Sequence, residues 1–109
     1  MAEGNEPHQL NYSDFVIEQH ILRETVNISA NGVLEIVTEP VTKTGGWYPL
    51  GISGFSYTGW ATQYVYPYSM RISEQQVGTA TVIFRLKNTY NSEIPVNSVS
   101  LYILWMRVN

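Results

Sequence analysis

The side chains that could take part in catalysis are two histidines and nine carboxylates. His8 lies in a polar N-terminal segment, and His20 falls at a predicted turn between two strand-like runs. A serine or threonine nucleophile needs a base beside it, and the sequence contains no G-x-S-x-G nucleophile elbow. We therefore interpret both histidines as surface residues. The alternative is a metal site formed by symmetry copies of His20 on the axis of an oligomer, and it rests on a single residue.

Paired carboxylates offer a second chemistry, because two of them can hydrolyse a glycosidic bond. Glu35 and Glu39 fall on the same face of one predicted strand, and Glu18 is expected nearby. Acidic residues on a polar strand face are usually only solvated, so we predict no catalytic residue and no enzyme. A small glycan-active enzyme is the least favoured alternative. The chain has no cysteine and no Asp-rich calcium loop, so we expect no metal site and no cofactor.

Glycines and aromatics gather in the stretch GGWYPLGISGFSYTGW, residues 45–60. A phosphate-binding loop would lead into a helix, whereas Gly45 and Gly46 lead into a strand-like run. We therefore predict one turn at these two glycines. Gly51 and Gly54 are predicted to be strand positions where a side chain would obstruct close packing.

The aromatic residues of this region indicate two different roles. Aromatic rings stack on the apolar faces of sugars, and Tyr and Trp add a polar group. The predicted ligand-binding residues, at strand ends or in loops, are Trp47, Tyr48, Tyr57 and Trp60. Residues at alternating positions further on are interpreted instead as one strand face, packed in the core or at a subunit interface: Tyr64, Tyr66, Tyr68, Met70 and Ile72.

Charge and hydropathy exclude several classes of partner. Net charge is −3 and the six basic residues are scattered, so we predict no binding to nucleic acid. The longest apolar run, residues 101–106, is too short to span a bilayer, so no membrane insertion is expected. The N-terminus lacks the apolar segment of a signal peptide.

Short strand-like runs separated by Gly, Asn, Pro and Ser predict an all-β fold. We predict an antiparallel β-sandwich of the jelly-roll or Ig-like kind with about seven strands. The predicted strands cover residues 14–19, 24–30, 33–41, 48–57, 63–73, 79–88 and 98–108. Residues 1–12 are predicted to be a flexible tail or linker, and residues 13–109 a single domain.

The last predicted strand is apolar on both faces. Val99, Leu101, Ile103 and Trp105 share one face. The other face carries Tyr102, Leu104 and Met106. A strand that is apolar on both sides needs cover on both, and a second copy of the chain is the simplest cover. We therefore predict a homo-oligomer, with a trimer favoured over a dimer, and Tyr102, Leu104 and Met106 at its interface.

Several stretches together resemble a known family. GWYPLGISGFSYTG, a Tyr-rich strand, TVIFRLKNTYNS and VSLYILWMRV, preceded by SDFVIEQ, cover residues 13–108. They resemble a small C-terminal domain of tail, tail-fibre or minor structural proteins from phages and prophages of Gram-positive, often gut, bacteria. The resemblance implies a β-sandwich that trimerises at the distal end of a tail. It also implies binding to a host cell-surface polysaccharide or protein, or capping of the fibre, without catalytic residues.

The expected location is therefore the virion tail, after synthesis in the bacterial cytoplasm without a signal peptide. The main alternative is a purely structural oligomerisation module, in which all the aromatics would be buried in the sandwich or between subunits.

Overall fold

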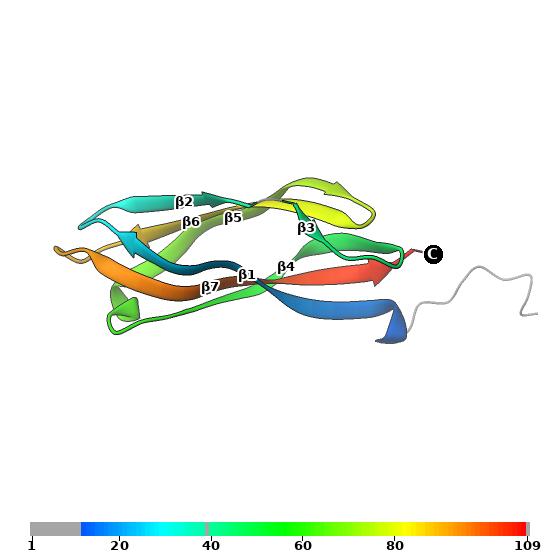
Figure 1. Cartoon of the computed structure of the whole chain (residues 1–109), viewed down its shortest axis with the longest axis horizontal. Helices are drawn as coiled ribbons and strands as arrows, with labels where there is room; N and C mark the ends of the chain where they lie inside the picture. Colours follow the sequence, from blue (N-terminus) through cyan, green and yellow to red (C-terminus); the bar gives the residue numbers. More distant parts are fainter. Residues whose placement is uncertain (1–11, 39, 109) are drawn as a thin grey trace, which may run out of the picture.

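A computed structural model describes residues 12–38 and 40–108, and they form two antiparallel sheets packed face to face (Figure 1). One sheet has the order β1-β7-β4, with β1 Phe15–Ile28, β7 Ile94–Arg107 and β4 Trp47–Thr58. The other is built on β6 Thr79–Asn88, which pairs with β5 Val65–Gln76, β2 Val33–Val37 and β3 Val41–Thr42. Short 3-10 turns precede β1 (η2 Tyr12–Asp14) and β5 (η3 Thr62–Tyr64). The all-β, seven-strand sandwich prediction is confirmed. Of the predicted tail, residues 1–12, only Tyr12 belongs to the described residues.

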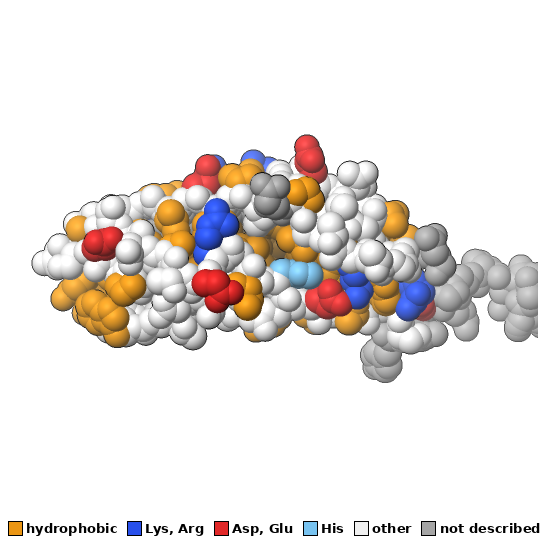
Figure 2. Space-filling view, in the orientation of Figure 1, with side chains coloured by type: hydrophobic (Ala, Val, Ile, Leu, Met, Phe, Trp, Pro, Cys, Tyr) orange, Lys and Arg blue, Asp and Glu red, His pale blue; other side chains and the backbone are white. Residues whose placement is uncertain are grey.

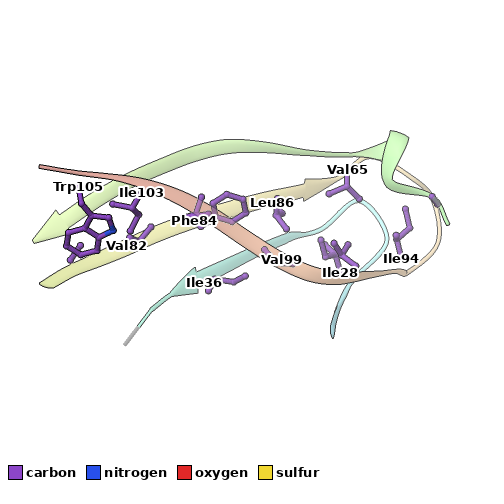
Figure 3. Close-up of a cluster of buried hydrophobic side chains, with 14 of the residues drawn as sticks. Ile28, Ile36, Val65, Val82, Phe84, Leu86, Ile94, Val99, Ile103 and Trp105 are labelled. Atoms are coloured by element: carbon purple, nitrogen blue, oxygen red, sulfur yellow. The ribbon is translucent and has the colours of Figure 1, made fainter. Parts of the chain in front are cut away.

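The core lies between the central strands of the two sheets (Figure 3). The strand predicted at residues 79–88 is β6, and its alternating apolar residues are all buried: Ala80, Val82, Phe84 and Leu86. The same holds for one face of β7, where the buried residues are Val99, Leu101, Ile103 and Trp105. Two alternating apolar faces that meet in this way remove their side chains from water, which is the main driving force for folding.

β1 is a single strand of 14 residues, whereas two strands with a turn at His20 were predicted. The prediction was wrong because the alternation of inward and outward side chains changes at a register shift between Ile21 and Arg23, while the strand itself continues. One extra residue in a strand changes which side chains face inward without ending the strand. His20 therefore lies in the middle of an edge strand, opposite Leu101.

The predicted strand 33–41 is interrupted between β2 and β3. Thr38 stands at the interruption, where its backbone N–H donates to the Val82 carbonyl and its hydroxyl accepts from the Val82 N–H, both at 3.0 Å. Pro40 follows and is exposed. Because proline has no N–H to donate to a strand ladder, Pro40 is tolerated at such an interruption.

The tyrosines of β5 do not share one face with Met70 and Ile72, contrary to the prediction. A register shift between Pro67 and Ser69 makes Tyr68 an extra residue in the strand. Met70 and Ile72 pack against the core, while Tyr66 and Tyr68 are about half exposed, at 47% and 49%. A bulge reverses the alternation and so separates the two sets.

The two glycine predictions have opposite outcomes. Gly45 and Gly46 have φ of +106° and +81°, which confirms the turn before β4. Gly51 and Gly54 do not lie in tight places, so that prediction was wrong. A Cβ at Gly51 would meet nothing within 4 Å, and one at Gly54 would only reach ordinary contact with Tyr102 at 3.8 Å.

Candidate functional site

The four predicted ligand-binding residues do not form one site. Trp47 begins β4, and Trp60 lies just beyond its end. The twelve residues of β4 extend for about 40 Å at the usual strand rise. A small ligand cannot touch both ends of such a strand, so each residue must be considered by its own surroundings.

Trp47 is part of the folded scaffold, not of an open surface. It is 9% exposed. The Lys43 Nζ lies 4.8 Å from its ring centroid and the Arg107 guanidinium carbon 4.3 Å from it. The Trp47 carbonyl accepts a hydrogen bond of 2.7 Å from the Gly78 N–H. These contacts join three segments at one end of the sandwich, each cation adding about 0.5–2 kcal/mol. Tyr48, next in β4, is half-buried opposite Met106.

Tyr57 also serves the fold. Its hydroxyl donates to the Val65 carbonyl at 2.9 Å, which ties the end of β4 to the start of β5. Its ring stacks on Phe55, with centroids 5.8 Å apart and planes 16° apart. Burial raises the pKa of the Tyr57 hydroxyl above its usual value, so it stays a protonated donor at neutral pH.

Trp60 is the one predicted residue that the structure presents openly, with 67% of its surface exposed. The residues that follow it are anchored. Ala61 is fully buried, and its carbonyl accepts from the Tyr64 N–H at 3.1 Å. The Tyr64 carbonyl in turn accepts from the Thr89 N–H at 2.8 Å and hydroxyl at 2.7 Å. An indole is therefore displayed on a backbone that is held in place.

Two tyrosines near the same turn form a stacked pair. The rings of Tyr64 and Tyr90 have centroids 4.5 Å apart and an interplanar angle of 26°. We call Trp60, Tyr64 and Tyr90 the aromatic end. Hydrophobic side chains gather at the end of the molecule that carries η3 (Figure 2). Residues 57–70 and 88–92 contain no charged side chain, so the chemistry here suits an uncharged ligand with apolar ring faces.

The sequence interpretation missed most of this group. Tyr64 was attributed to the alternating face of a strand, but it lies in η3, before β5 begins. Tyr90 lies between two predicted strands, residues 79–88 and 98–108, and only the fold brings its ring onto Tyr64.

A second candidate is an open depression of about 590 Å³ at the side of the sandwich. It is lined by His20 and its neighbours on β1, and by Thr38, Pro40, Val41 and Thr42 at the interrupted edge. The His20 Nε2 accepts a hydrogen bond of 3.4 Å from the Trp105 indole N–H and lies 3.7 Å from a Glu18 oxygen. Glu18 also pairs with Lys43. Inward polar groups of this kind keep an edge strand from pairing with other chains.

His20 is expected to make stability fall on mild acidification. Burial lowers the pKa of His20 below 6.5, Glu18 partly opposes this shift, and Lys43 adds to it. A group whose pKa is lower in the folded state stabilises the fold fully above its unfolded pKa and loses this contribution as pH falls through that region. Protonation would also remove the lone pair that accepts from Trp105. Chemical unfolding at pH 7.5 and 5.5 should show a smaller pH-dependent loss for His20→Gln than for wild type. An equal loss in both chains would contradict this role.

Two of the carboxylates considered for glycoside hydrolysis form separate ion pairs. Glu18, on β1, pairs with Lys43, whereas Glu35, on β2 of the other sheet, pairs with Arg85. Glu39 lies outside the described residues, and so does His8. Within residues 12–38 and 40–108, no group of three or more His, Asp or Glu side chains is placed to hold a metal ion.

The sequence interpretation also missed Asn88, the fully buried last residue of β6. The two hydrogens of its amide nitrogen are shared among three carbonyls, those of Ile28, Ser29 and Ser92, which lie 2.9–3.1 Å from the nitrogen. Its side-chain oxygen accepts from the Tyr90 N–H at 2.8 Å. Asn88 therefore holds the loop that carries half of the stacked tyrosine pair.

The residues predicted for an oligomer interface lie on the outer face of β7. Tyr102, Leu104 and Met106 are each half-buried by the flanking strands β1 and β4.

No helix among the described residues is long and apolar enough to span a membrane. Comparison of the chain with family models, with curated proteins and with solved structures gives no match.

Proposed function

We propose that this chain is a non-enzymatic recognition module of a phage or prophage tail that binds a host-surface glycan through its aromatic end. The observation that carries the proposal is Trp60, a two-thirds exposed indole on an anchored turn. A large apolar side chain gains most by leaving water, so leaving it exposed forgoes stabilisation of about 1.5–3 kcal/mol. Binding a ligand there would recover part of that energy.

The anchored turn supports a ligand-binding role for Trp60 over exposure of its side chain without a function. Ala61 fills the core beside Trp60, and backbone hydrogen bonds fix the residues that follow. A ligand that binds a side chain on a pre-ordered backbone loses less conformational entropy than one that must order a loop. The stacked Tyr64 and Tyr90 rings add hydroxyl groups for the polar edges of a sugar.

The assignment to a tail rests on the family resemblance of residues 13–108. It implies a module at the distal end of a virion tail, where host-surface polysaccharide is the expected partner. The non-enzymatic character is supported by the engagement of Glu18 and Glu35 in separate ion pairs on different sheets.

The alternative function, a purely structural assembly module, is favoured by a different observation. Ile17 and Ile21 on β1 are exposed to 57% and 54% although they flank the apolar outer face of β7. An exposed apolar sheet face is typical of a surface that another chain covers.

The two functions are separated by titrating the chain with cell-wall polysaccharide from Gram-positive bacteria. Trp60→Ala is expected to weaken binding about tenfold or more, since a central aromatic contact contributes more than about 1.4 kcal/mol. Tyr68→Ala removes another half-exposed aromatic, which is the fourth residue of β5 and lies outside the aromatic end as defined, and should leave affinity unchanged. Unchanged affinity in Trp60→Ala, or equal loss in both variants, would contradict the proposed site. No binding by the wild-type chain to any such polysaccharide would favour the structural module.

A further inference from the structure

Four segments of the chain meet at the aromatic end, and none of them contains a charged residue. They are residues 29–32, 57–70, 88–92 and 94–97. The Asn31 N–H donates to the Tyr90 carbonyl at 2.9 Å, which joins the first segment to the third. Thr58 lies opposite Asn97, which joins the second segment to the fourth. The aromatic end is therefore built entirely from uncharged stretches of the sequence.

Two charged residues flank the loop at residues 88–92, and their charges offset each other. Lys87 precedes this loop and Glu93 follows it. The Lys87 ammonium donates to the Asn31 carbonyl at 2.6 Å, so the cation nearest to the loop is already bonded to the backbone. Glu93 is exposed. The border of the aromatic end therefore has no net positive charge.

The other basic residues are paired or lie farther away. Arg85 forms an ion pair with Glu35. The rest are Arg23 on β1, across β7 from β4, Arg71 on β5, and Lys43 and Arg107 beside Trp47. The length of β4 separates Trp47 from the aromatic end by about 40 Å, and Arg71 lies about 20 Å beyond the first residue of β5. Exposed charges are largely screened beyond about 8 Å in physiological salt.

A polymer with a phosphate in every repeat is poorly matched to such a surface. Proteins bind phosphate through Lys and Arg, whose charge-assisted hydrogen bonds replace the water that the anion loses. An anion that is buried without such a partner pays a large desolvation cost. A sugar ring that lays its apolar face on an indole carries no charge to desolvate, and its hydroxyl groups can stay in water.

We infer that the aromatic end binds uncharged polysaccharide and discriminates against the polyol-phosphate polymers that share Gram-positive cell walls, an inference that rests on the proposed function. Affinity comes from ring stacking on Trp60 and on the Tyr64–Tyr90 pair. Selectivity arises because no cation among residues 12–38 and 40–108 is placed on Trp60, as Lys43 and Arg107 are on Trp47. Binding of this kind is insensitive to salt, since it releases no counterions from the polymer.

Titration with two purified polymers tests the selectivity. One is a neutral, phosphate-free polysaccharide from Gram-positive cell walls, and the other is poly(ribitol phosphate). We expect the neutral polymer to bind at least about tenfold more tightly, with an affinity that changes less than about twofold between about 20 and 300 mM salt.

The possible failures of this titration are distinguishable. Equal or tighter binding of poly(ribitol phosphate), or a strongly salt-dependent affinity for the neutral polymer, would overturn the inference and leave host-surface recognition in place. If neither polymer binds, the proposed function fails and the inference fails with it.

A charge reversal beside the rings tests the physical cause. Glu93→Lys adds a cation next to the loop that carries Tyr90, and should raise affinity for poly(ribitol phosphate) at least about threefold at low salt. Glu74→Lys is the matched control, because it makes the same change of charge about 30 Å beyond the start of β5 and should give no gain. Both glutamates are exposed, so both variants should fold, with thermal melting as the check.

The neutral polysaccharide serves as the second readout for both variants. Its affinity should stay within about twofold of wild type, because stacking does not depend on the added charge. No gain of poly(ribitol phosphate) binding in Glu93→Lys, or an equal gain in Glu74→Lys, would contradict local charge as the source of selectivity.

Discussion

Replacing Asn88 with alanine is expected to destabilise the fold by about 3–5 kcal/mol, enough to unfold a chain of marginal stability. The side chain is fully buried and makes four hydrogen bonds, three as donor and one as acceptor. Alanine would remove these partners from the three carbonyls and the Tyr90 N–H, of which the Ser29 carbonyl alone is known to keep another donor, the Gly32 N–H at 2.9 Å. Each group buried without a partner costs about 1–3 kcal/mol, and relaxation or water recovers part of this sum. Denaturant unfolding measures the loss.

Asn91→Ala is the matched control, because the same residue type is exposed three positions later and should change stability by less than about 0.5 kcal/mol. Asn88→Asp separates hydrogen bonding from volume. It keeps the shape and the acceptor but replaces the donor, and should also be strongly destabilised. Near-wild-type stability of Asn88→Asp would contradict the assigned donor role.

Trp105→Ala is the second large effect that we expect. Trp105 is the largest of the fully buried side chains, and its indole N–H donates to His20. Removing a buried tryptophan ring leaves a cavity and costs about 3–5 kcal/mol. Thermal or denaturant unfolding should show this loss, with Val33→Ala on the exposed side of β2 as a control that changes little.

Trp105→Phe tests the hydrogen bond to His20 separately. It keeps most of the packing but removes the donor, so we expect a smaller loss than for alanine. It should also weaken the dependence of stability on pH near 6, since the neutral imidazole would no longer be favoured by an indole donor. A pH dependence identical to that of wild type would contradict the coupling of these two residues.

The sequence predicted the parts of the fold that follow from strict alternation. The predicted bounds of β6 were correct, because apolar residues such as Val82 and Phe84 alternate strictly with polar ones in this strand. The bounds predicted for β1 and the face predicted for β5 were wrong, because each strand contains an inserted residue, Leu22 in β1 and Tyr68 in β5. The insertion reverses which of the following side chains face the core. Nothing local distinguishes such a bulge from an ordinary strand residue, since the partner strand decides where the extra residue is tolerated.

The candidate site was predicted only in part for a similar reason. Trp60 follows a glycine in a loop, which is visible in the sequence. Trp47 looked equivalent, but Lys43 and Arg107 cover it, and Arg107 is far away in the chain. Partners brought together by topology cannot be read from spacing, and the same applies to the pairing of Tyr64 with Tyr90.

The three indole N–H signals in an NMR spectrum test the proposed recognition site most directly, because the chain contains three tryptophans in three environments. Trp105 is fully buried, Trp47 is 9% exposed and Trp60 is 67% exposed. Titration with the cell-wall polysaccharide is expected to shift the Trp60 signal progressively to saturation while the other two stay in place. A saturable shift at Trp47 with an unmoved Trp60, or three unmoved signals at saturating polysaccharide, would contradict glycan recognition at the aromatic end.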